Sequence, residues 1–340
     1  MNLTAATIVL LLLLIGPIAI APIEHNLEMF ILAIGIVATF LAGGPRLEVV
    51  HSALSEPIMI TIAVIVAALI FRATRIRLDE SFGWMRARIR RSILTAISIF
   101  LVAMLSSIIT AIVAALVLVE VVGLLHLHDG PRVRVVVAGC FAIGLGSALT
   151  PAGGPLSTLA ASALHLGFFG LFDLLAPSVV PGVVAMSLLA GYFASGEYFD
   201  ASPGPQVRET LADVFRQGAK LYGFIVGLVL IGAAYEPLAR RFVPMLNDAA
   251  LFWANTISAV LDNATLVAIE IRALPSGRAR DVILALLISG GMLIPGNIPN
   301  VIAAGALKIE SGRWARIAIP IGLVTLGIYF ALLQISIFIG

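Results

Sequence analysis

The chain has 340 residues, of which 60% are hydrophobic and 12% are charged, and its mean hydropathy is +1.09. Soluble domains carry about 25% charged residues, so a soluble protein of this length could not cover its apolar surface with polar side chains. The composition excludes a soluble enzyme, a disordered chain and a nucleic-acid-binding protein, and the net charge of +2 gives no polybasic surface. The single cysteine, Cys140, excludes a disulfide framework and a multi-cysteine metal site, and we expect it to be a small buried apolar side chain.

The N-terminal part begins with three apolar runs. Residues 3–23, 27–44 and 57–71 are candidates for membrane-spanning helices, which need about 20 apolar residues. The stretch 72–91 is the most basic in the chain, with seven arginines against two acidic residues. The positive-inside rule therefore predicts that this stretch is a cytoplasmic loop, and its end, FGWMRARIRR, could also form a short amphipathic helix at the interface.

Two longer apolar runs follow. Residues 92–125 are too many for one crossing at ordinary tilt, and their middle, residues 106–110, is polar. This run is either one long tilted helix or a hairpin that enters the membrane and returns. Residues 133–165 are again too many, and the segment from Thr150 to Pro155 interrupts them with two prolines and two glycines. Such a segment cannot continue an unbroken helix, because proline removes a backbone donor and clashes with the preceding turn.

The C-terminal half follows a hydrophilic link. We expect further apolar segments near 178–195, 217–235, 248–271, 280–309 and 316–338. We divide the chain into an N-terminal region of helices and basic loop (1–91), a first repeat (92–195), a connector (196–216) and a second repeat (217–340).

An internal similarity relates the two halves. GSALTPAGGPLSTLAA at 146–161 aligns with GGMLIPGNIPNVIAAG at 290–305 and pairs two prolines, and AALVLVE at 114–120 aligns with ATLVAIE at 264–270. Hydrophobic segments interrupted by glycine and proline at corresponding positions of two halves indicate a binding site at the bilayer midplane. Broken backbone is tolerated there only where it lines a cavity or packs on protein, and its free N–H and C=O groups can hold an ion. The alternative is a pair of proline kinks that only shape packing.

Asp262 lies near the centre of the apolar run 248–271, and the nearest arginine is Arg272 at its end. An ionised aspartate at the bilayer centre costs about 2.5–3.5 kcal/mol on insertion scales, so it needs a cation, a proton or a partner. We predict that Asp262 binds a hard monovalent cation or a proton within a set of oxygen ligands. Competition of Na⁺ and H⁺ for one carboxylate is sufficient for antiport. An ion pair with a distant arginine is the alternative.

Two glutamates occupy matching places in the halves. Glu120 and Glu270 each lie toward the end of an apolar run. Interfacial solvation explains this position, and the functional alternative is a second titratable group or a hydrogen bond that stabilises a hinge.

Three motifs of the chain resemble those of a known group of proteins. SAVLDNATLVAIEI (258–271), LTPAGGPLSTLAA (149–161) and LIPGNIPNVIAAG (293–305) resemble the ion transporter superfamily. Within it they are most similar to the predicted prokaryotic cation transporters, which are related to bacterial sodium/proton antiporters and arsenite pumps. The resemblance covers about residues 92–338. It implies an all-α polytopic membrane protein of about ten membrane segments, with two inverted repeats that each contain a re-entrant hairpin and a broken transmembrane helix.

The resemblance also implies where the site lies. The first hairpin tip would fall at Ser106, Ser107 and Thr110 and the second at Asp262, Asn263 and Thr265, with the helix breaks at Thr150 to Pro155 and Pro295 to Asn300. The expected ion-binding residues are Asp262, Asn263, Thr265, Asn297, Asn300, Ser106, Ser107, Thr110, Thr150, Gly153, Gly154, Ser157 and Thr158. The expected helix-breaking residues are Pro151, Pro155, Pro295, Gly296 and Pro299.

One departure concerns the charge of the site. The related antiporters resemble each other in having an Asp-Asn-like pair at the hairpin tip of both halves. In this chain, Ile112 and Val113 occupy the positions where the repeat would place the Asp-Asn pair of the first half. The site would then carry a single central carboxylate. This fits electroneutral exchange or single-cation symport, and it leaves room for an anionic substrate neutralised by one sodium ion.

The predicted membrane topology conflicts with the positive-inside rule in the second half of the chain. If residues 72–91 are inside and 92–125 form a hairpin, then Arg272, Arg278 and Arg280 lie outside, against the usual bias. A single crossing by 92–125 would move them inside but give up the hairpin. We keep the hairpin because of the run length and the repeat.

We therefore expect a secondary active transporter of small inorganic cations, exchanging Na⁺ and H⁺ across the inner membrane of a prokaryotic cell. It would not be an enzyme and would need no cofactor and no metal beyond a transported Na⁺. The expected partners are membrane lipid, Na⁺ and H⁺, not nucleic acid, with a homodimer left open. The alternatives are a sodium-coupled carrier or exporter of a small anion or oxyanion, an intramembrane enzyme and a structural membrane subunit. The sequence has no G-x-x-x-x-G-K-[ST] match, which disfavours ATP-driven pumping by this chain alone.

Overall fold

The structure is a computed structural model that describes residues 2–20, 26–55, 88–195, 211–260, 263–271 and 276–339, with residues 57–58, 61–62, 65–66, 69 and 85. In this part of the chain every regular element is an α-helix or a short 3₁₀-helix. The predicted cytoplasmic loop at 72–91 lies mostly outside the described residues, as does most of the connector at 196–216.

Five of the described helices are long and apolar enough to cross a membrane. They are α5 (Arg91–Ile109), α7 (Asp129–Gly146), α9 (Gly170–Phe193), α10 (Leu211–Phe242) and α15 (Ser311–Ile339). Four further apolar helices are shorter, namely α1 (Leu3–Ala19), α3 (Leu27–Leu41), α6 (Ala111–Leu124) and α14 (Ile298–Leu307). The chain is therefore a helical, multi-pass membrane protein, in which several of the expected segments are shorter than a full crossing.

Further helices are short, including the helical residues 47–55. Others are α8 (Pro155–Ala163), α11 (Asp248–Ala254), α12 (Asn263–Glu270) and α13 (Ser276–Ser289), with the 3₁₀-helices η1 (Ser147–Leu149), η2 (Pro151–Gly153), η3 (Val243–Met245), η4 (Asn255–Ala259) and η6 (Ile294–Gly296).

Several helices begin before their apolar runs. Helix α7 begins at Asp129, whereas the run was expected from 133, and α9 begins at Gly170, whereas its run was expected from 178. Both helices carry an aspartate in the first turn, Asp129 and Asp173, where a negative charge interacts favourably with the helix dipole. An estimate that counts apolar residues misses such polar first turns.

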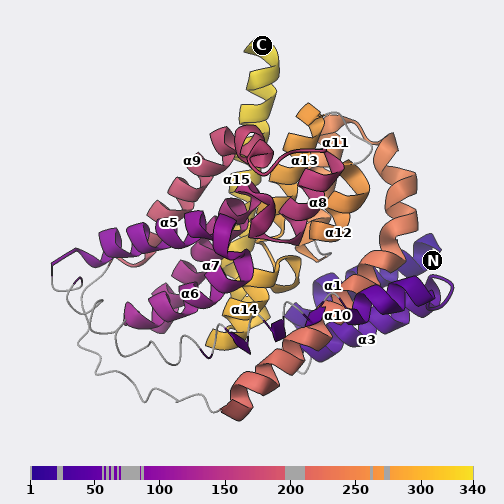
Figure 1. Cartoon of the computed structure of the whole chain (residues 1–340), viewed down its shortest axis with the longest axis horizontal. Helices are drawn as coiled ribbons and strands as arrows, with labels where there is room; N and C mark the ends of the chain where they lie inside the picture. Colours follow the sequence, from indigo (N-terminus) through magenta and orange to yellow (C-terminus); the bar gives the residue numbers. More distant parts are fainter. Residues whose placement is uncertain are drawn as a thin grey trace.

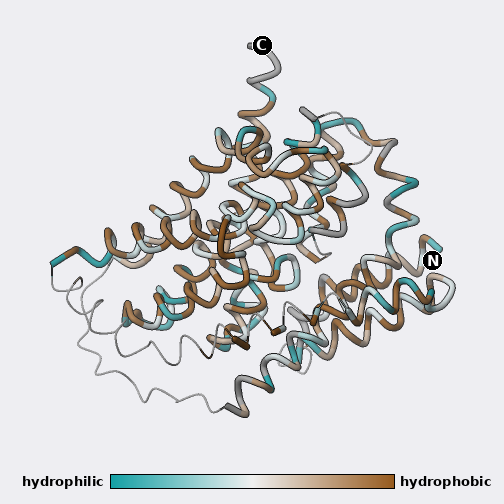
Figure 2. The backbone as a smooth tube through the Cα atoms, viewed as in Figure 1, coloured by the Kyte–Doolittle hydropathy of each residue, from teal (hydrophilic) through white to brown (hydrophobic). Residues whose placement is uncertain are grey.

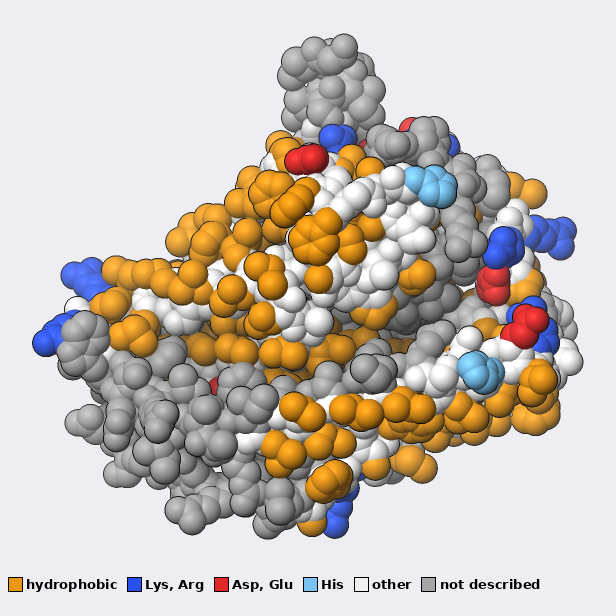
Figure 3. Space-filling view, viewed as in Figure 1, with side chains coloured by type: hydrophobic (Ala, Val, Ile, Leu, Met, Phe, Trp, Pro, Cys, Tyr) orange, Lys and Arg blue, Asp and Glu red, His pale blue; other side chains and the backbone are white. Residues whose placement is uncertain are grey.

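Two helices form the centre of the molecule. In the window of α7 and η1, 83% of the residues are buried, whereas 33% are buried in that of α15. In α13 and the segment after it, residues 282–296 are all buried, and α13 packs against α7. The outer helices consist mainly of apolar residues, brown in Figure 2, and many of their side chains are exposed, as the orange atoms in Figure 3 show for one face. The protein therefore surrounds α7 and α13 with other helices, and these outer helices offer apolar side chains to lipid.

Helices α1, α3 and α10 lie together at one side of the molecule (Figure 1). Helix α10 packs along α3, and a Cβ atom added to Gly35 would lie 2.6 Å from the carbonyl oxygen of Gly227. Close backbone approach at paired small residues is a typical packing mode of helices in membranes. The hydroxyl of Tyr235 on α10 donates to the carbonyl of Ala6 on α1 over 2.6 Å, so the three helices form one unit.

The run 92–125 forms two helices rather than one long helix. Helix α5 ends at Ile109, α6 begins at Ala111, and Thr110 between them has φ of 74°. The chain reverses there, and α5 and α6 lie against each other (Figure 1). The two helices form a hairpin with its turn at Thr110, one of the three expected tip residues, and α5 alone is long and apolar enough to cross a membrane.

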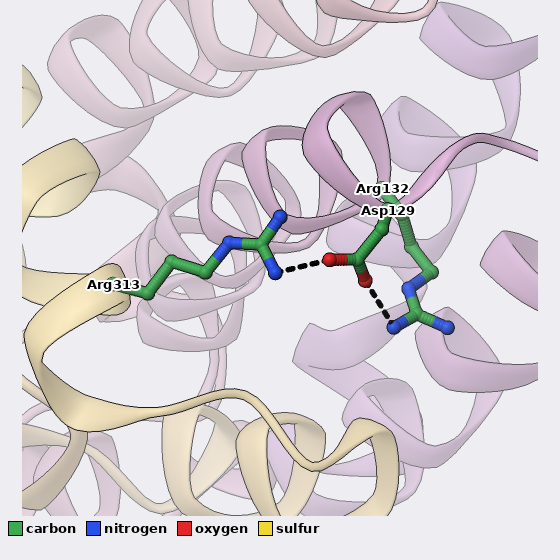
Figure 4. A network of polar contacts seen from close by, with 3 residues as sticks. All are labelled: Asp129, Arg132 and Arg313. Atoms are coloured by element: carbon green, nitrogen blue, oxygen red, sulfur yellow. Dashed lines mark hydrogen bonds and ion pairs between the residues drawn. The ribbon is translucent and has the colours of Figure 1, made fainter.

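An ion-pair network joins α7 to α15 at their N-terminal ends (Figure 4). Asp129 accepts from Arg132 over 2.6 Å on its own helix and from Arg313 in the first part of α15. All three side chains are at least one-third exposed, so this network lies at the surface.

Candidate functional site

A cavity of about 40 Å³ lies where the interrupted helices meet, which is room for a small ion or a few water molecules. It is lined by Ala111, Ile112, Gly144, Ser147, Ala148, Gly153, Gly154, Pro155, Leu156, Ser157, Asn263, Leu287, Asn297, Ile298 and Pro299. The lining thus combines the first residues of α6, α8, α12 and α14 with residues of α7 and α13.

The first interruption follows α7. The helix ends at Gly146, and the chain passes through η1, an extended Thr150 and η2 before α8 begins at Pro155. A Cβ atom at Gly153 would overlap the backbone of Ser147, so only glycine fits there. The hydroxyl of Thr150 accepts from the N–H of Ala152 and donates to the carbonyl of Ser107, which ties the break to the first hairpin.

The second interruption follows α13. That helix ends at Ser289, and η6 and an extended Asn297 precede α14. The side-chain amide of Asn300 donates to the carbonyls of Gly290 and Leu293, each over 2.9 Å. Asn300 therefore satisfies backbone acceptors that the broken helix leaves free.

Both interruptions begin earlier than the sequence predicted. Unwinding starts at Ser147 rather than Thr150, and at Gly290 rather than Pro295. The last predicted residues of the second break, Pro299 and Asn300, belong to the first turn of α14, because proline is favoured in the first turn, where no backbone donor is needed.

A hydrogen bond joins the segments before and after residues 261–262, which lie outside the described residues; we call these segments the limbs of the second hairpin. Helix α11 and η4 form the first limb, and α12 forms the second. Asn255 donates from Nδ2 to Oε2 of Glu270 over 3.0 Å, and both side chains are buried. Interfacial solvation is therefore the wrong interpretation for Glu270, and its hydrogen bond stabilises the hairpin, whereas Glu120 is half-buried.

The hairpins and the broken helices pack crosswise. Helix α6 of the first hairpin contacts α14, the segment after the second break, and α12 of the second hairpin contacts α8, the segment after the first break. A hydroxyl of each hairpin also contacts the helix before its break. Ser258 donates to the carbonyl of Leu286 over 3.2 Å, and the hydroxyl of Ser106, which donates to Ala103 over 2.6 Å, lies 3.3 Å from the carbonyl of Ile143.

The structure brings together part of the expected site. Among the described residues, the expected ones that line the cavity are Gly153, Gly154, Pro155, Ser157, Asn263, Asn297 and Pro299. Those that do not line it are Ser106, Ser107, Thr110, Thr150, Thr158, Asn300, Pro151, Pro295 and Gly296. Asp262 and the side chain of Thr265 lie outside the described residues.

Several of the expected residues away from the cavity contact nearby backbone groups. The hydroxyl of Ser107 donates to the carbonyl of Met104 over 2.7 Å, and that of Thr158 donates to Pro151 over 2.6 Å. Thr110 accepts from the N–H of Val113 at the start of α6. Gly296 lies so near Gly290 that a Cβ atom would be 2.6 Å from its carbonyl oxygen.

Sequence reasoning missed eight cavity residues, which are Ala111, Ile112, Gly144, Ser147, Ala148, Leu156, Leu287 and Ile298. A signal existed for two of them, because Gly144 and Ser147 belong to the small-residue run GLGS directly before the predicted break. The other six have apolar side chains and carry no chemical signal, since 60% of the chain is hydrophobic.

The polar lining is neutral among the described residues. Its side chains are the hydroxyls of Ser147 and Ser157 and the amides of Asn263 and Asn297. Hydroxyl and amide oxygens, with backbone carbonyls, are ligands for hard cations. The N-terminal ends of α6, α8, α12 and α14 also lie at the cavity, and such ends favour negative charge. In the described residues, no group of three or more His, Cys, Asp or Glu side chains could hold a resident metal.

Cys140, on α7, is buried as expected, with its sulfur 3.7 Å from the carbonyl of Pro299.

No curated protein matches the chain. Residues 3–336 match the family described as "Protein of unknown function (DUF1646)", and because this match covers nearly the whole chain, the protein belongs to that family.

Proposed function

We propose that the protein is a secondary active transporter of small inorganic cations that exchanges Na⁺ for H⁺ by alternating access. The observation that carries the proposal is the neutral, oxygen-bearing cavity between two interrupted, buried helices. Asp262 directly precedes Asn263, which lines this cavity, and would be the carboxylate that Na⁺ and H⁺ share. The membrane would be the cell membrane of a prokaryote, as the resemblance of the motifs to the ion transporter superfamily implies.

The order of the elements supports two repeats. In the first half, the hairpin α5–α6 is followed by the buried helix α7, and after a break come the short helix α8 and the long apolar helix α9. In the second half, the hairpin α11–α12 is followed by the buried helix α13, and after a break come the short helix α14 and the long apolar helix α15. The reciprocal contacts of α6 with α14 and of α8 with α12 are the arrangement that a two-fold relation between halves would produce. Repeats that meet at interrupted helices are typical of secondary transporters, in which one unit moves against the other around a fixed site.

Charge balance supports a single cation. The polar side chains that line the cavity within the described residues are neutral, so one carboxylate at residue 262 would be balanced by one Na⁺ or one H⁺. Exchange of one for the other would leave the charge of the site unchanged. Broken backbone at the bilayer midplane is tolerated because the surrounding helices bury it, as they do around α7 and α13.

A second candidate is sodium-coupled carriage of a small anion. The observation that favours it is the convergence of four helix N-termini, those of α6, α8, α12 and α14, on one cavity. Each such end carries about half a positive charge. Together with one Na⁺ they would bind an anion such as an oxyanion.

The proposal is tested with purified protein in liposomes under an imposed Na⁺ gradient, with a pH-sensitive dye inside. Wild type should move protons in response to Na⁺, and Asp262→Asn should abolish this flux. Asp173→Asn is the matched control, because Asp173 is an exposed aspartate in the first turn of α9. Retention of the flux in Asp262→Asn would contradict the proposal. Sodium-dependent uptake of labelled phosphate, sulfate or arsenite without proton flux would favour the second candidate.

A further inference from the structure

Gly144 and Asn297 lie opposite each other in the cavity wall. A Cβ atom added to Gly144 would lie 3.0 Å from Nδ2 of Asn297, and the next nearest atom, the carbonyl oxygen of Leu287, would be 3.9 Å away. Both residues line the cavity. The absent side chain of Gly144 therefore provides the space that the amide of Asn297 occupies, and no other neighbour competes for it.

The wall that carries Gly144 is held in place. Gly146 packs so closely on α5 that a Cβ atom would overlap the carbonyl of Ala103. Ser147 donates to the carbonyl of Gly144 over 3.1 Å, and the hydroxyl of Ser106, which donates to Ala103 over 2.6 Å, also lies 3.3 Å from the carbonyl of Ile143. Helix α7 is also buried over this stretch, so a methyl group at residue 144 cannot be accommodated by movement of the helix.

Asn297, in contrast, is the partner that can move. It precedes α14 with an extended backbone, φ −152° and ψ 141°, yet its side chain makes no capping hydrogen bond to that helix. An asparagine at this position usually caps the helix by accepting from a backbone N–H in the first turn. The amide of Asn297 lies instead beside α7, where its position depends on the space at Gly144.

We infer that Gly144 is a specificity-determining residue of the cavity, which sets the position of the Asn297 amide and so the size of the cation that the cavity accepts. This inference rests on the function proposed above. Gly290 has a related place, since a Cβ atom there would lie 3.0 Å from Nδ2 of Asn263. It would also lie 2.9 Å from the carbonyl oxygen of Gly296, so alanine at 290 would disturb the backbone as well. Gly144 is therefore the cleaner position to test.

The experiment measures the binding of Na⁺, Li⁺ and K⁺ to purified protein in detergent from the rise in Tm with ion concentration. Gly144→Ala should reduce Na⁺ affinity about tenfold, which corresponds to 1.4 kcal/mol, and should reduce Li⁺ affinity less because Li⁺ is smaller. Gly305→Ala is the matched control, since a Cβ atom at this α14 glycine would meet nothing within 4 Å. It should leave the affinities and their ratio unchanged.

A second variant reaches the same contact from the other side. Asn297→Ser shortens the side chain without touching α7, and should shift the preference toward K⁺. In the double variant Gly144→Ala/Asn297→Ser, the methyl group has no amide to displace, so adding Gly144→Ala should change the ion preference little. Non-additivity of this kind identifies coupled residues, and a purely structural role would not produce it.

The outcomes separate the two proposals. If wild type binds none of the three ions, the function proposed above fails and this inference falls with it. If wild type binds Na⁺ but Gly144→Ala keeps its ratio of Li⁺ to Na⁺ affinity, the inference alone is overturned. If Gly144→Ala does not fold, an unchanged ion preference in Asn297→Ser overturns the inference, and a shift toward K⁺ supports it.

Discussion

Asn255 and Glu270, which are 15 residues apart in the chain, form a buried hydrogen bond between the two limbs of the second hairpin. A carboxyl group in such a place is stabilised by the donor that it meets, and removal of that donor leaves it unsatisfied. The pair therefore joins limbs that are otherwise short, since α11 has 7 residues and α12 has 8.

The first prediction concerns this pair. Asn255→Ala should lower the free energy of unfolding by about 1.5–3 kcal/mol, because it leaves a buried carboxyl oxygen without its donor. Glu270→Gln should cost less, because glutamine keeps an oxygen that can accept from Asn255. Thermal unfolding in detergent measures both effects. Thr256→Ala, at the neighbouring and more exposed position, is the control. Equal losses in Asn255→Ala and the control would show that the hydrogen bond does not stabilise the hairpin.

The second prediction concerns the close crossing of α5 and α7. A Cβ atom at Gly146 would overlap the carbonyl of Ala103, so Gly146→Ala should destabilise the protein by about 1–3 kcal/mol or more. Gly327→Ala, in the interior of α15, meets nothing within 4 Å and should stabilise the helix by about 0.5–1 kcal/mol. Denaturation curves of the two variants should therefore move in opposite directions from wild type. Tolerance of alanine at 146 would contradict the close packing.

The third prediction concerns the turn of the first hairpin. Thr110 has φ of 74°, a conformation that costs a β-branched residue of order 1–3 kcal/mol, and its hydroxyl accepts from Val113. Thr110→Ala loses the hydroxyl cap and keeps the strain, so it should destabilise by about 1 kcal/mol. Thr110→Gly loses the same cap but relieves the strain, so it should be the more stable of the two variants. A Tm for the glycine variant below that of the alanine variant would contradict this account of the turn.

The fourth prediction concerns the surface network of Asp129, Arg132 and Arg313 (Figure 4). Its side chains are largely solvated, so Asp129→Asn should cost no more than about 1 kcal/mol. The cost should shrink further at about 1 M salt, where charges are screened over about 3 Å. A double-mutant cycle with Arg313→Gln isolates the contact between α7 and α15. A large, salt-independent loss would show that the network is not a surface feature.

The interrupted helices could be predicted from the sequence because their signal is chemical and local. Proline and glycine at 151–155 and 295–299 cannot continue a helix, whatever surrounds them. The starts of the breaks could not be predicted in this way. Helix α7 ends at Gly146, where the backbone of Ala103, distant in the chain, approaches too closely for a side chain. Gly290, directly after α13, faces the carbonyl oxygen of Gly296 and the side-chain amide of Asn263, and both contacts depend on how the chain folds after the helix ends.

The roles of the polar residues were harder to predict. Ser106, Ser107 and Thr158 were expected at the ion, but they donate to nearby backbone carbonyls, which serine and threonine in helices commonly do. Asn297 was predicted to bind the ion and lines the cavity, whereas its neighbour Gly144, which also lines it, was not predicted because a glycine carries no functional group to signal its role. Residues that shape a cavity by their small size can be identified only after the opposing wall is known.

The crosswise packing of α6 with α14 and of α8 with α12 has a consequence for biosynthesis. Helices α6 and α8 leave the ribosome well before α12 and α14, which pack against them. The first half is therefore inserted while one wall of the cavity is missing. The cavity is completed only when residues from about 263 onward have been translated and have packed against the first half. A message truncated before that point would yield a product that lacks the cavity altogether, because the residues of the second half that line it would be missing.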